Sequence, residues 1–375
     1  MAAAVAAHWD GPLTGLVVAP HGQVDAPAIG GIAVLGAAHP VPDAAGVAAA
    51  RRIGALLDGL QVDDLVIALL SGGGSALLVD PAPGLTLADK QQATRQLLAS
   101  GLPIGAINCV RSKLSAIKGG RLACRAAPAV VHALAISDVP GDEFSAIASG
   151  PFSADPTTLA DARAAVAQCG AELPLAVLRR LADPAAETPK PGDAAFKRVT
   201  TTICARSADA LAAAARVLAA AGYDVLSTDD RVDSDAAILA QSHARRAREL
   251  LAAGRRAALV SGGETTVRVT NPHGRGGRNT TYLLALALAL DGIAGVAALA
   301  ADTDGIDGTE TNAGAFLDAG TCARSRERGL DATALLAAND AWVLFSAVDA
   351  LFVTGPTGTN ANDLRIVLVD PPSRT

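Results

Sequence analysis

The 375-residue sequence has few aromatic residues, few charged residues and no excess of basic charge. Aromatic residues make up 3% of the chain and charged residues 18%, whereas 50% of the residues are hydrophobic, a composition that excludes a disordered chain. The 31 Lys and Arg residues against 37 Asp and Glu residues give a net charge of -6. A dedicated nucleic-acid-binding protein usually carries a basic excess, so we expect no nucleic-acid partner.

Paired cysteines and long apolar runs are also missing. The five cysteines lie far apart, with no CxxC pair and no histidine at zinc spacing, and they indicate ordinary buried thiols in a reducing compartment. The longest apolar run, residues 282–290, is less than half of the about 20 residues that a membrane span needs. The first residues, MAAAVAAHWDG, lack the basic and apolar regions of a signal peptide. We therefore expect a cytoplasmic protein that does not contact the membrane.

Short runs rich in Val, Ile and Leu recur along the chain, separated by segments with helical periodicity, which is typical of an α/β fold with a mostly parallel sheet. We expect strands over residues 15–20, 32–37, 65–70, 130–136, 224–228, 257–261, 296–301 and 351–355. The capping-box pair Thr86 and Asp89 predicts a helix that stops at Gly101, and further helices are expected over residues 207–221 and 234–254. The length suggests two domains, which we expect to meet near residue 250.

Five of the expected strands run directly into loops of Gly, Ser, Thr and Asp. The loops are SGGGS (71–75), SDVPGD (137–142), SGGETT (261–266), DTDGIDG (302–308) and GPTGTN (355–360). Because ligands of open α/β sheets bind at the carboxyl ends of the strands, we expect these loops to line one site. Glycine lets backbone N–H groups approach an anion and hydroxyl groups add donors, so phosphate or carboxylate is the expected ligand. A single such turn is equally well explained as a tight connection, but five together favour a site.

The common phosphate-binding signatures are absent from the sequence. It contains no GxxxxGK[ST] motif, no GxGxxG after a strand and no protein-kinase motif set. If the protein handles a nucleotide, it binds it by another arrangement.

Cationic side chains lie in two glycine-containing segments, NCVRSKLSAIKGGR and HGRGGRN. We expect Arg111, Lys118 and Arg278 to contact an anion, because their glycine and asparagine neighbours are typical of ligand-binding loops. Lys113 and Arg121 are expected on a solvated helix face.

Carboxylates that follow the strands are candidates for a magnesium site or a general base, since Mg²⁺ prefers hard oxygen ligands. They are Asp138, Asp142, Asp302, Asp304 and Asp307. Asp-Gly pairs are also common in turns, so we expect about half of these residues to be structural.

Together these motifs resemble the class II glycerate 2-kinase family, whose C-terminal part is called the MOFRL domain. The resemblance covers nearly the whole chain and is carried, in chain order, by HPVPD, LVIALLSGGGSALL, NCVRSKLSAIKGGRLA, ISDVPGDEFSAIASGP, SGGETTV, GRGGRN, DTDGIDGTETNAGA, ND and TGPTGTNANDL. It implies an α/β protein with a large Rossmann-like domain, with a mostly parallel sheet, over residues 1–245. A smaller α/β MOFRL domain is implied over residues 250–370.

The same resemblance implies ATP-dependent phosphorylation of D-glycerate to 2-phospho-D-glycerate with Mg²⁺. Arg278 in GGRN matches the family's catalytic arginine, and Asp138 and Asp304 are the implied catalytic carboxylates. Asp142 and Asp304 are the implied metal ligands. The implied substrate- and ATP-binding residues are Ser71, Gly72, Gly73, Gly74, Ser75, Arg111, Lys118, Ser261, Gly262, Gly263, Glu264 and Asn279. We expect a monomer or a homodimer.

The sequence departs from the family pattern in two places. The family's catalytic lysine lies in a GKA-like stretch a few residues before the position that matches Met1, and MAAAVAAHWDGPL resembles the continuation of the helix that carries it. We therefore expect this chain to lack that lysine, to be impaired in turnover and to reflect a late start or a truncation. After GRGGRN the chain reads Thr280-Thr281-Tyr282 where the family usually has Gln-Glu, which removes a polar contact.

Two other functions are compatible with the sequence. A hydroxypyruvate reductase would transfer hydride, but the dinucleotide fingerprint that it would use is absent. A catalytically inactive relative would keep the fold and bind a small anion or a nucleotide. Oxidation of NADH with hydroxypyruvate would identify the first, and thermal stabilisation by ligand without ATP consumption would identify the second.

Overall fold

The computed structural model describes residues 1–23, 27–139, 141–170, 172–227 and 232–372, so that Pro140 and Thr228 of the expected loop and strand lie outside the described residues. The chain divides into two compact units, Met1–Cys204 and Ala205–Thr375. This division precedes the domain change expected near residue 250. The reason is that β7 (Asp224–Ser227) pairs with β8 (Ala257–Ser261) and α10 (Ala236–Ala252) packs on α11 (Arg278–Ala289), both within the second unit.

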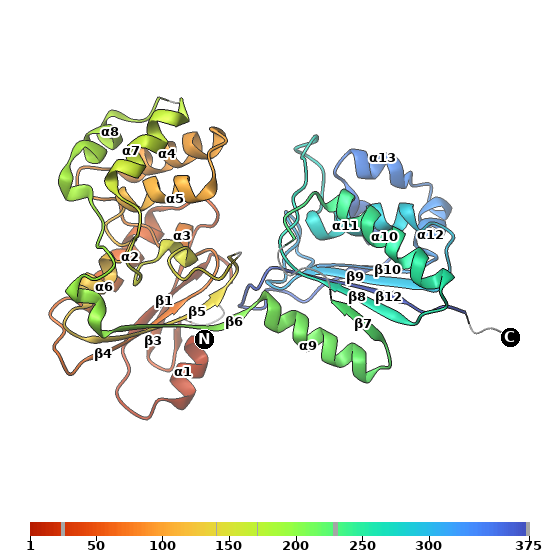
Figure 1. Ribbon diagram of the computed structural model, residues 1–375, viewed down its shortest axis with the longest axis horizontal. Helices are drawn as coiled ribbons and strands as arrows, with labels where there is room; N and C mark the ends of the chain where they lie inside the picture. Colours follow the sequence, from red (N-terminus) through yellow and green to blue (C-terminus); the bar gives the residue numbers. More distant parts are fainter. Residues whose placement is uncertain (24–26, 140, 171, 228–231, 373–375) are drawn as a thin grey trace. The chain divides into compact units, whose positions relative to one another are not determined.

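The first unit contains two three-stranded sheets (Figure 1). One has the order β1 (Gly15–Pro20), β3 (Ile32–Ala37), β2 (Ala28–Ile29), with β1 parallel to β3 and the short β2 antiparallel. The other has the order β4 (Leu65–Leu70), β5 (Val130–Ser137), β6 (Val199–Arg206), and β4 runs parallel to β5. The expected parallel strands are confirmed in this unit.

Helices of the first unit begin where the sequence supplies capping residues. The expected helix after Thr86 is α4 (Leu87–Ala99), and Thr86 and Asp89 form the capping box. The other helices are α1 (Ala2–His8), α2 (Ala44–Leu57), α3 (Gly74–Leu77), α5 (Ile104–Lys113), α6 (Arg121–Ala126), α7 (Leu159–Cys169) and α8 (Leu175–Ala182), with short 3₁₀ turns at Ile147–Ser149, Pro184–Ala186 and Ala194–Arg198. In Figure 1, α4, α5, α7 and α8 lie together, and they share a buried hydrophobic cluster.

The second unit is built on a six-stranded mixed sheet with the order β11 (Leu351–Phe352), β10 (Gly314–Leu317), β9 (Val296–Asp302), β12 (Asp363–Val369), β8, β7. In Figure 1, α10 and α11 cover one face of this sheet and α9 (Ser207–Ala220) the other. The remaining helices are α12 (Thr321–Glu327), α13 (Ala332–Ala337) and α14 (Ala341–Ala347).

A mostly parallel sheet is the wrong expectation for this unit, because two strands that the sequence analysis missed, β10 and β12, run antiparallel to their neighbours. β12 was missed because the charged residues Asp363 and Arg365 interrupt its apolar pattern. Since β12 is antiparallel to both β8 and β9, those two strands run in the same direction. Their carboxyl ends therefore lie at one edge of the sheet, and two of the five loops that we expect to line one site, those after β8 and β9, follow strands that end there.

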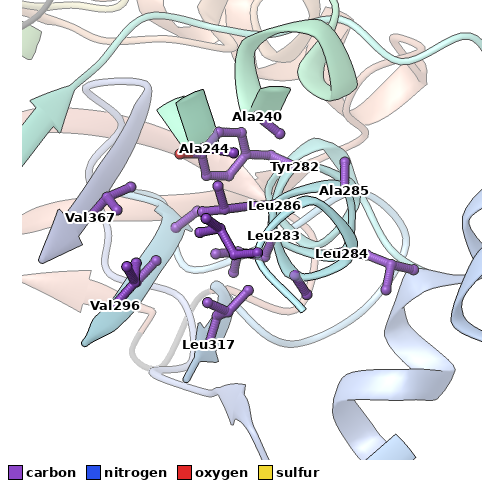
Figure 2. Packing of buried hydrophobic residues seen from close by; sticks show 14 of the residues in the cluster. Ala240, Ala244, Tyr282, Leu283, Leu284, Ala285, Leu286, Val296, Leu317 and Val367 are labelled. Atoms are coloured by element: carbon purple, nitrogen blue, oxygen red, sulfur yellow. The ribbon is translucent and has the colours of Figure 1, made fainter. Parts of the chain in front are cut away.

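The core of the second unit surrounds α11. Figure 2 shows Tyr282, Leu283 and Leu286 of this helix facing Ala240 and Ala244 of α10 and the side chains of the sheet. The apolar run of residues 282–290 is therefore a core helix, which explains its hydrophobicity on all sides. Within the described ranges, no helix combines the length and the apolar character that crossing a membrane would require.

A buried histidine pairs with the tyrosine of this core helix. His243 of α10 lies with its Nδ1 atom 2.7 Å from the Tyr282 hydroxyl, and the two rings meet edge to face. Burial, with a smaller effect of Arg365, lowers the pKa of His243 to about 4 from its ordinary value of 6.5. The folded state therefore keeps the imidazole neutral over a pH range in which the unfolded chain binds a proton.

Acid is expected to destabilise the second unit through His243. Because the folded pKa is depressed, its contribution is complete above pH 6.5 and is lost as the pH falls toward about 4, in total about 3 kcal/mol. Urea unfolding of the wild-type protein and of His243→Gln between pH 7 and pH 4 measures this difference. Identical pH dependence of the two unfolding free energies would contradict the prediction.

Candidate functional site

Arg278 lies at the first position of α11, at the sheet edge where β8 and β9 end. The helix begins there because the buried carboxylate of Asp307 accepts hydrogen bonds from the backbone N–H groups of Asn279 and Thr280, both at 2.9 Å. The Thr280 hydroxyl donates to the same carboxylate at 2.7 Å. Asp307 thus satisfies the free N–H groups of the helix start and fixes the direction of Arg278. Of the five candidate carboxylates, this one is structural.

Three carboxylates hold the Arg278 guanidinium. Its Nε donates to both oxygens of Asp363, at 2.9 and 3.0 Å, and its Nη1 donates to Glu264 at 2.9 Å. Its Nη2 donates to Asp302. Asp302 and Asp363 are buried, whereas Glu264 is exposed, and the Arg278 side chain keeps 25% of its surface open to solvent. The arginine is therefore fixed on one side and accessible on the other.

The charged groups around Arg278 shift one another's pKa values. Burial disfavours the charge on Arg278, but Asp363, Glu264 and Asp302 outweigh it and raise its pKa above the ordinary value, so it stays cationic. Burial and the neighbouring Asp363 raise the pKa of Asp302 to about 7 although Arg278 acts in the opposite direction. A carboxyl group of this kind exchanges a proton near neutral pH.

Arg365 of β12 forms hydrogen bonds at the same sheet edge as Arg278. It is fully buried, and its Nη2 donates to Asp363 at 2.7 Å while its Nη1 donates to the carbonyl oxygen of Gly262 at 2.6 Å. Asp363 also accepts a 2.7 Å hydrogen bond from the buried amide of Asn279. Arg365 therefore connects the turn after β8 to the carboxylate that holds Arg278.

The sequence-predicted residues of the second unit are found around this network. Ser261 is buried at the end of β8, Gly262 and Gly263 form the turn, and Gly263 has a φ of 78°, which favours glycine. Asp304 follows β9, where its backbone N–H donates to Asp302 at 3.1 Å and its Oδ1 accepts from the backbone N–H of Ile306 at 2.8 Å. The structure therefore places Ser261, Gly262, Gly263, Glu264, Arg278, Asn279 and Asp304 at one sheet edge.

In the first unit, the SGGGS turn follows β4. Gly73 has a φ of 77°, and a Cβ atom on Gly72 would lie 2.1 Å from Oδ2 of Asp138, so that the turn and this carboxylate lie against each other. The Ser75 hydroxyl lies 2.7 Å from that of Ser149. Lys118 donates from Nζ to the Ser75 carbonyl oxygen at 2.6 Å. Three of the predicted features, the turn, Asp138 and Lys118, are thus neighbours.

Replacement of Gly72 by alanine is expected to push the Asp138 carboxylate away from the turn and to lower the free energy of unfolding by about 1–3 kcal/mol, the usual cost of overpacking. Gly105→Ala in α5 is the matched control, since a Cβ there meets no atom within 4 Å. Chemical denaturation of both variants measures the effect. Equal stability of the two variants would show that Asp138 moves aside at no cost.

Two cations of the first unit do not lie where the sequence suggested. Lys113 was expected on a solvated face but is fully buried, with its Nζ 2.7 Å from Asp155 and 2.6 Å from the Thr188 hydroxyl. Arg121 is half-buried and donates to the carbonyl oxygens of residues 186 and 187, which makes it structural rather than solvated. Arg111 is half-buried and donates from Nη1 to Asn108 Oδ1 at 3.2 Å.

The two predicted metal ligands belong to different compact units. Asp142 lies in the first unit, half-buried and with a φ of 56°, and Asp304 lies in the second. In the part of the chain that the structure describes, no group of three His, Cys, Asp or Glu residues could hold a metal ion.

Sequence reasoning missed two residues of the Arg278 network, Asp363 and Arg365. A signal was available, because in DLRIVLV the two charged residues occupy the same alternating positions as the buried Val367 and Val369, which indicates a buried ion pair in a strand.

Comparison with known proteins agrees with this architecture. A family model described as "Domain of unknown function (DUF4147)" matches residues 1–182, and the MOFRL family model matches residues 257–363. A protein of Agrobacterium vitis named "Putative hydroxypyruvate reductase" is 47% identical over 375 residues, which cover 98% of this chain and 84% of that protein.

The D-glycerate 2-kinase of Thermotoga maritima is 38% identical over 359 residues, which cover 95% of this chain and 84% of the kinase. The crystal structure of the glycerate kinase from Thermotoga maritima has a TM-score of 0.86 to this structure at 37% identity, and the match covers 95% of this chain and 85% of that one. Because these matches extend over nearly the whole chain, the chain belongs to the glycerate kinase family that combines a DUF4147 region with a MOFRL region.

Proposed function

We propose that this protein transfers the γ-phosphoryl group of ATP to the 2-hydroxyl group of D-glycerate, giving 2-phospho-D-glycerate and ADP. The observation that carries the proposal is Arg278, a cation fixed by buried carboxylates and still open to solvent on one side. Family membership and a relative named D-glycerate 2-kinase support it.

Arg278 is suited to stabilise the phosphoryl group during transfer. A guanidinium has five N–H groups, and the contacts to Asp363, Glu264 and Asp302 leave one on each Nη atom for phosphoryl oxygens. Because the arginine is already oriented, it adds charge stabilisation without reorganising as the transition state forms.

The carboxylates near Arg278 fit a magnesium-bound nucleotide. Glu264, Asp302, Asp304 and Asp363 outnumber the two arginines of the edge, Arg278 and Arg365, so the site is acidic and would repel a metal-free polyphosphate. Asp304 would hold the ion together with phosphate oxygens and water, as Mg²⁺ commonly binds, and Asp142 is the second carboxylate that we assign to metal. The ion would neutralise charge on the phosphates.

Proton transfer completes the proposed reaction. The 2-hydroxyl oxygen forms a bond to the γ-phosphorus, the bond from this phosphorus to the β–γ bridging oxygen breaks, and the hydroxyl proton passes to a carboxylate. We assign this role to Asp138, which lies against the SGGGS turn, with Asp304 as the catalytic carboxylate beside Arg278. The remaining predicted residues bind substrate or ATP: Ser71, Gly72, Gly73, Gly74, Ser75, Arg111, Lys118, Ser261, Gly262, Gly263, Glu264 and Asn279.

A hydroxypyruvate reductase is the second candidate, favoured by the name of the Agrobacterium vitis relative. One experiment separates the two functions: ADP release from Mg-ATP and D-glycerate is measured beside NADH oxidation with hydroxypyruvate. We expect ADP release that depends on D-glycerate and no NADH oxidation. NADH oxidation alone would establish the reductase, and thermal stabilisation by ligands without either reaction would establish a binding protein.

A further inference from the structure

We infer that Lys90, Arg111 and Lys118 form a binding site for the carboxylate group of the sugar acid, and that Lys90 is a member of this site that no sequence motif indicated. The inference rests on the proposed function for the identity of the ligand, but the site itself rests on the contacts of the three cations. The proposed site lies within the first unit.

The three side chains lie in a small region around the end of α5. Lys90 of α4 donates from Nζ to the carbonyl oxygens of Leu114 at 3.2 Å and of Arg111 at 3.4 Å. Lys118 reaches the Ser75 carbonyl oxygen at the SGGGS turn, and Arg111 contacts the Asn108 side chain. Each cation therefore contacts neutral oxygen atoms.

No carboxylate lies in ion-pair contact with any of these three cations among the residues that the structure describes. The Asp80 carboxylate acts on the pKa of Lys90, but its ion pair is with Arg51, at 3.4 Å. Lys113, only a few residues away, shows the contrast, because it is equally buried and pairs with Asp155. The fold thus neutralises one buried lysine and leaves two others without a counter-ion.

Burial of the Lys90 and Lys118 ammonium groups without a counter-ion among the described residues lowers the stability of the fold. Lys118 is 1% exposed and Lys90 5% exposed, and like charges in a medium of low polarity repel strongly. Burial, with the charges of Lys90 and Arg111, lowers the pKa of Lys118 well below its ordinary value. Burial, with the charge of Arg111, lowers the pKa of Lys90 to about 7, although Asp80 acts in the opposite direction. The C-terminal carbonyl groups of α5 offset part of the charge on Lys90, but Lys118 has a single carbonyl contact. A bound anion would supply the missing counter-charge.

The ligand is assigned by the contrast between the two units. The Arg278 edge carries an excess of carboxylates and suits a nucleotide that brings its own metal ion. In the Lys118 region none of the three cations is ion-paired with a carboxylate among the described residues, and such a region suits an anion that binds without a metal ion, which in the proposed reaction is the sugar acid. Arg111 is half-buried and would contact the carboxylate with its planar guanidinium, while Lys118 and Lys90 would add positive potential behind it.

Calorimetric titration of the full chain with D-glycerate, in the absence of nucleotide and metal, tests the site. We expect binding of D-glycerate, competition by inorganic phosphate and no binding of glycerol, which lacks the carboxylate. Lys90→Met and Lys118→Met are each expected to weaken D-glycerate binding about tenfold or more, the usual effect of losing a charged partner. Lys197→Met, the same change at an exposed lysine of the first unit, is expected to leave it unchanged.

Stability without ligand separates this site from a purely structural role. If the lysines only brace α5 and the SGGGS turn, Lys90→Met and Lys118→Met lower the melting temperature and leave the affinity of the folded fraction for D-glycerate intact. That result would overturn the inference, as would loss of Mg-ATP binding with D-glycerate binding retained. Binding of phosphate without binding of D-glycerate would assign the site to phosphate and would also overturn the inference. Binding is measured without turnover, so this test is independent of the proposed kinase activity. If the variants bind as expected but the wild-type chain transfers no phosphoryl group, the site is upheld and the kinase activity is rejected.

Discussion

Replacement of Arg278 by alanine is expected to lower kcat about 100- to 1000-fold with a smaller change in KM, the range found when a preorganised charge stabiliser is removed. The reason is geometric, since Asp363, Glu264 and Asp302 hold the guanidinium in place before substrate arrives. Arg278→Lys keeps the charge but cannot hold three carboxylates and two phosphoryl oxygens at once, so we expect it to recover only part of the rate. Initial rates of ADP release at saturating Mg-ATP and D-glycerate measure the effect.

Arg275→Ala is the matched control for this variant. Arg275 lies in the same glycine-rich loop, where it pairs with Glu310 and stacks on the Trp342 ring, 3.5 Å from the ring centre. It makes no contact with Asp302 or Asp363. We expect a rate close to that of the wild type, and an equal loss in both variants would mean that the loop as a whole, rather than Arg278, supports turnover.

Replacement of Lys113 by methionine is expected to lower the free energy of unfolding by about 3–5 kcal/mol, the usual cost of leaving a buried charge without its partner. Asp155 would be that charge. Although burial raises the pKa of Asp155, hydrogen bonds from Lys113 and Thr157 lower it to about 2, so it is ionised near neutral pH. Urea unfolding at pH 7 measures the loss.

The double variant Lys113→Met, Asp155→Asn tests the cause of that loss. It removes both charges, and we expect it to be more stable than Lys113→Met alone. Lys197→Met, at an exposed position, is expected to unfold like the wild type. If the double variant is no more stable than Lys113→Met, the loss comes from packing and not from an unpaired carboxylate.

The first unit was the easier part to predict from the sequence. Its strands over residues 15–20, 32–37 and 65–70 occur with the expected bounds, because short uninterrupted apolar runs leave few alternatives. The capping pair Thr86 and Asp89 similarly fixed the start of α4. These features depend on interactions between residues that are close together in the sequence, so the sequence alone predicts them.

The second unit was harder because its central strand carries charge. Asp363 and Arg365 of β12 are stable inside the sheet only through each other, through Arg278 and through the carbonyl oxygens of the turn after β8. The carbonyl oxygen of Gly262 lies 103 residues earlier in the chain than Arg365, and Arg278 lies 85 residues earlier than Asp363, so the local sequence does not show these partners. Missing β12 also led to the expectation of a mostly parallel sheet, since this strand supplies the antiparallel pairs with β8 and β9.

The candidate site was only partly predicted, because some of its contacts also depend on residues that are distant in the sequence. Loops after β8 and β9 could be assigned to one edge because ligand-binding loops follow strands, and Arg278, Glu264 and Asp304 do lie there. The sequence could not predict that buried Lys113 has a carboxylate partner and that buried Lys118 has none among the described residues. Only the fold places Asp155 next to Lys113, whereas Lys118 contacts a carbonyl oxygen. Burial and pairing are tertiary properties of these lysines.

Phosphorus NMR of the product formed from ATP, D-glycerate and Mg²⁺ by the 375-residue chain is the most direct test of the proposed activity. A phosphate on carbon 2 of glycerate couples to one proton, whereas a phosphate on carbon 3 couples to two. We expect a product resonance split into a doublet, with ADP formed in equal amount. A triplet would contradict the proposed position of transfer, and NADH oxidation with hydroxypyruvate without any phosphorylated product would contradict the kinase activity itself.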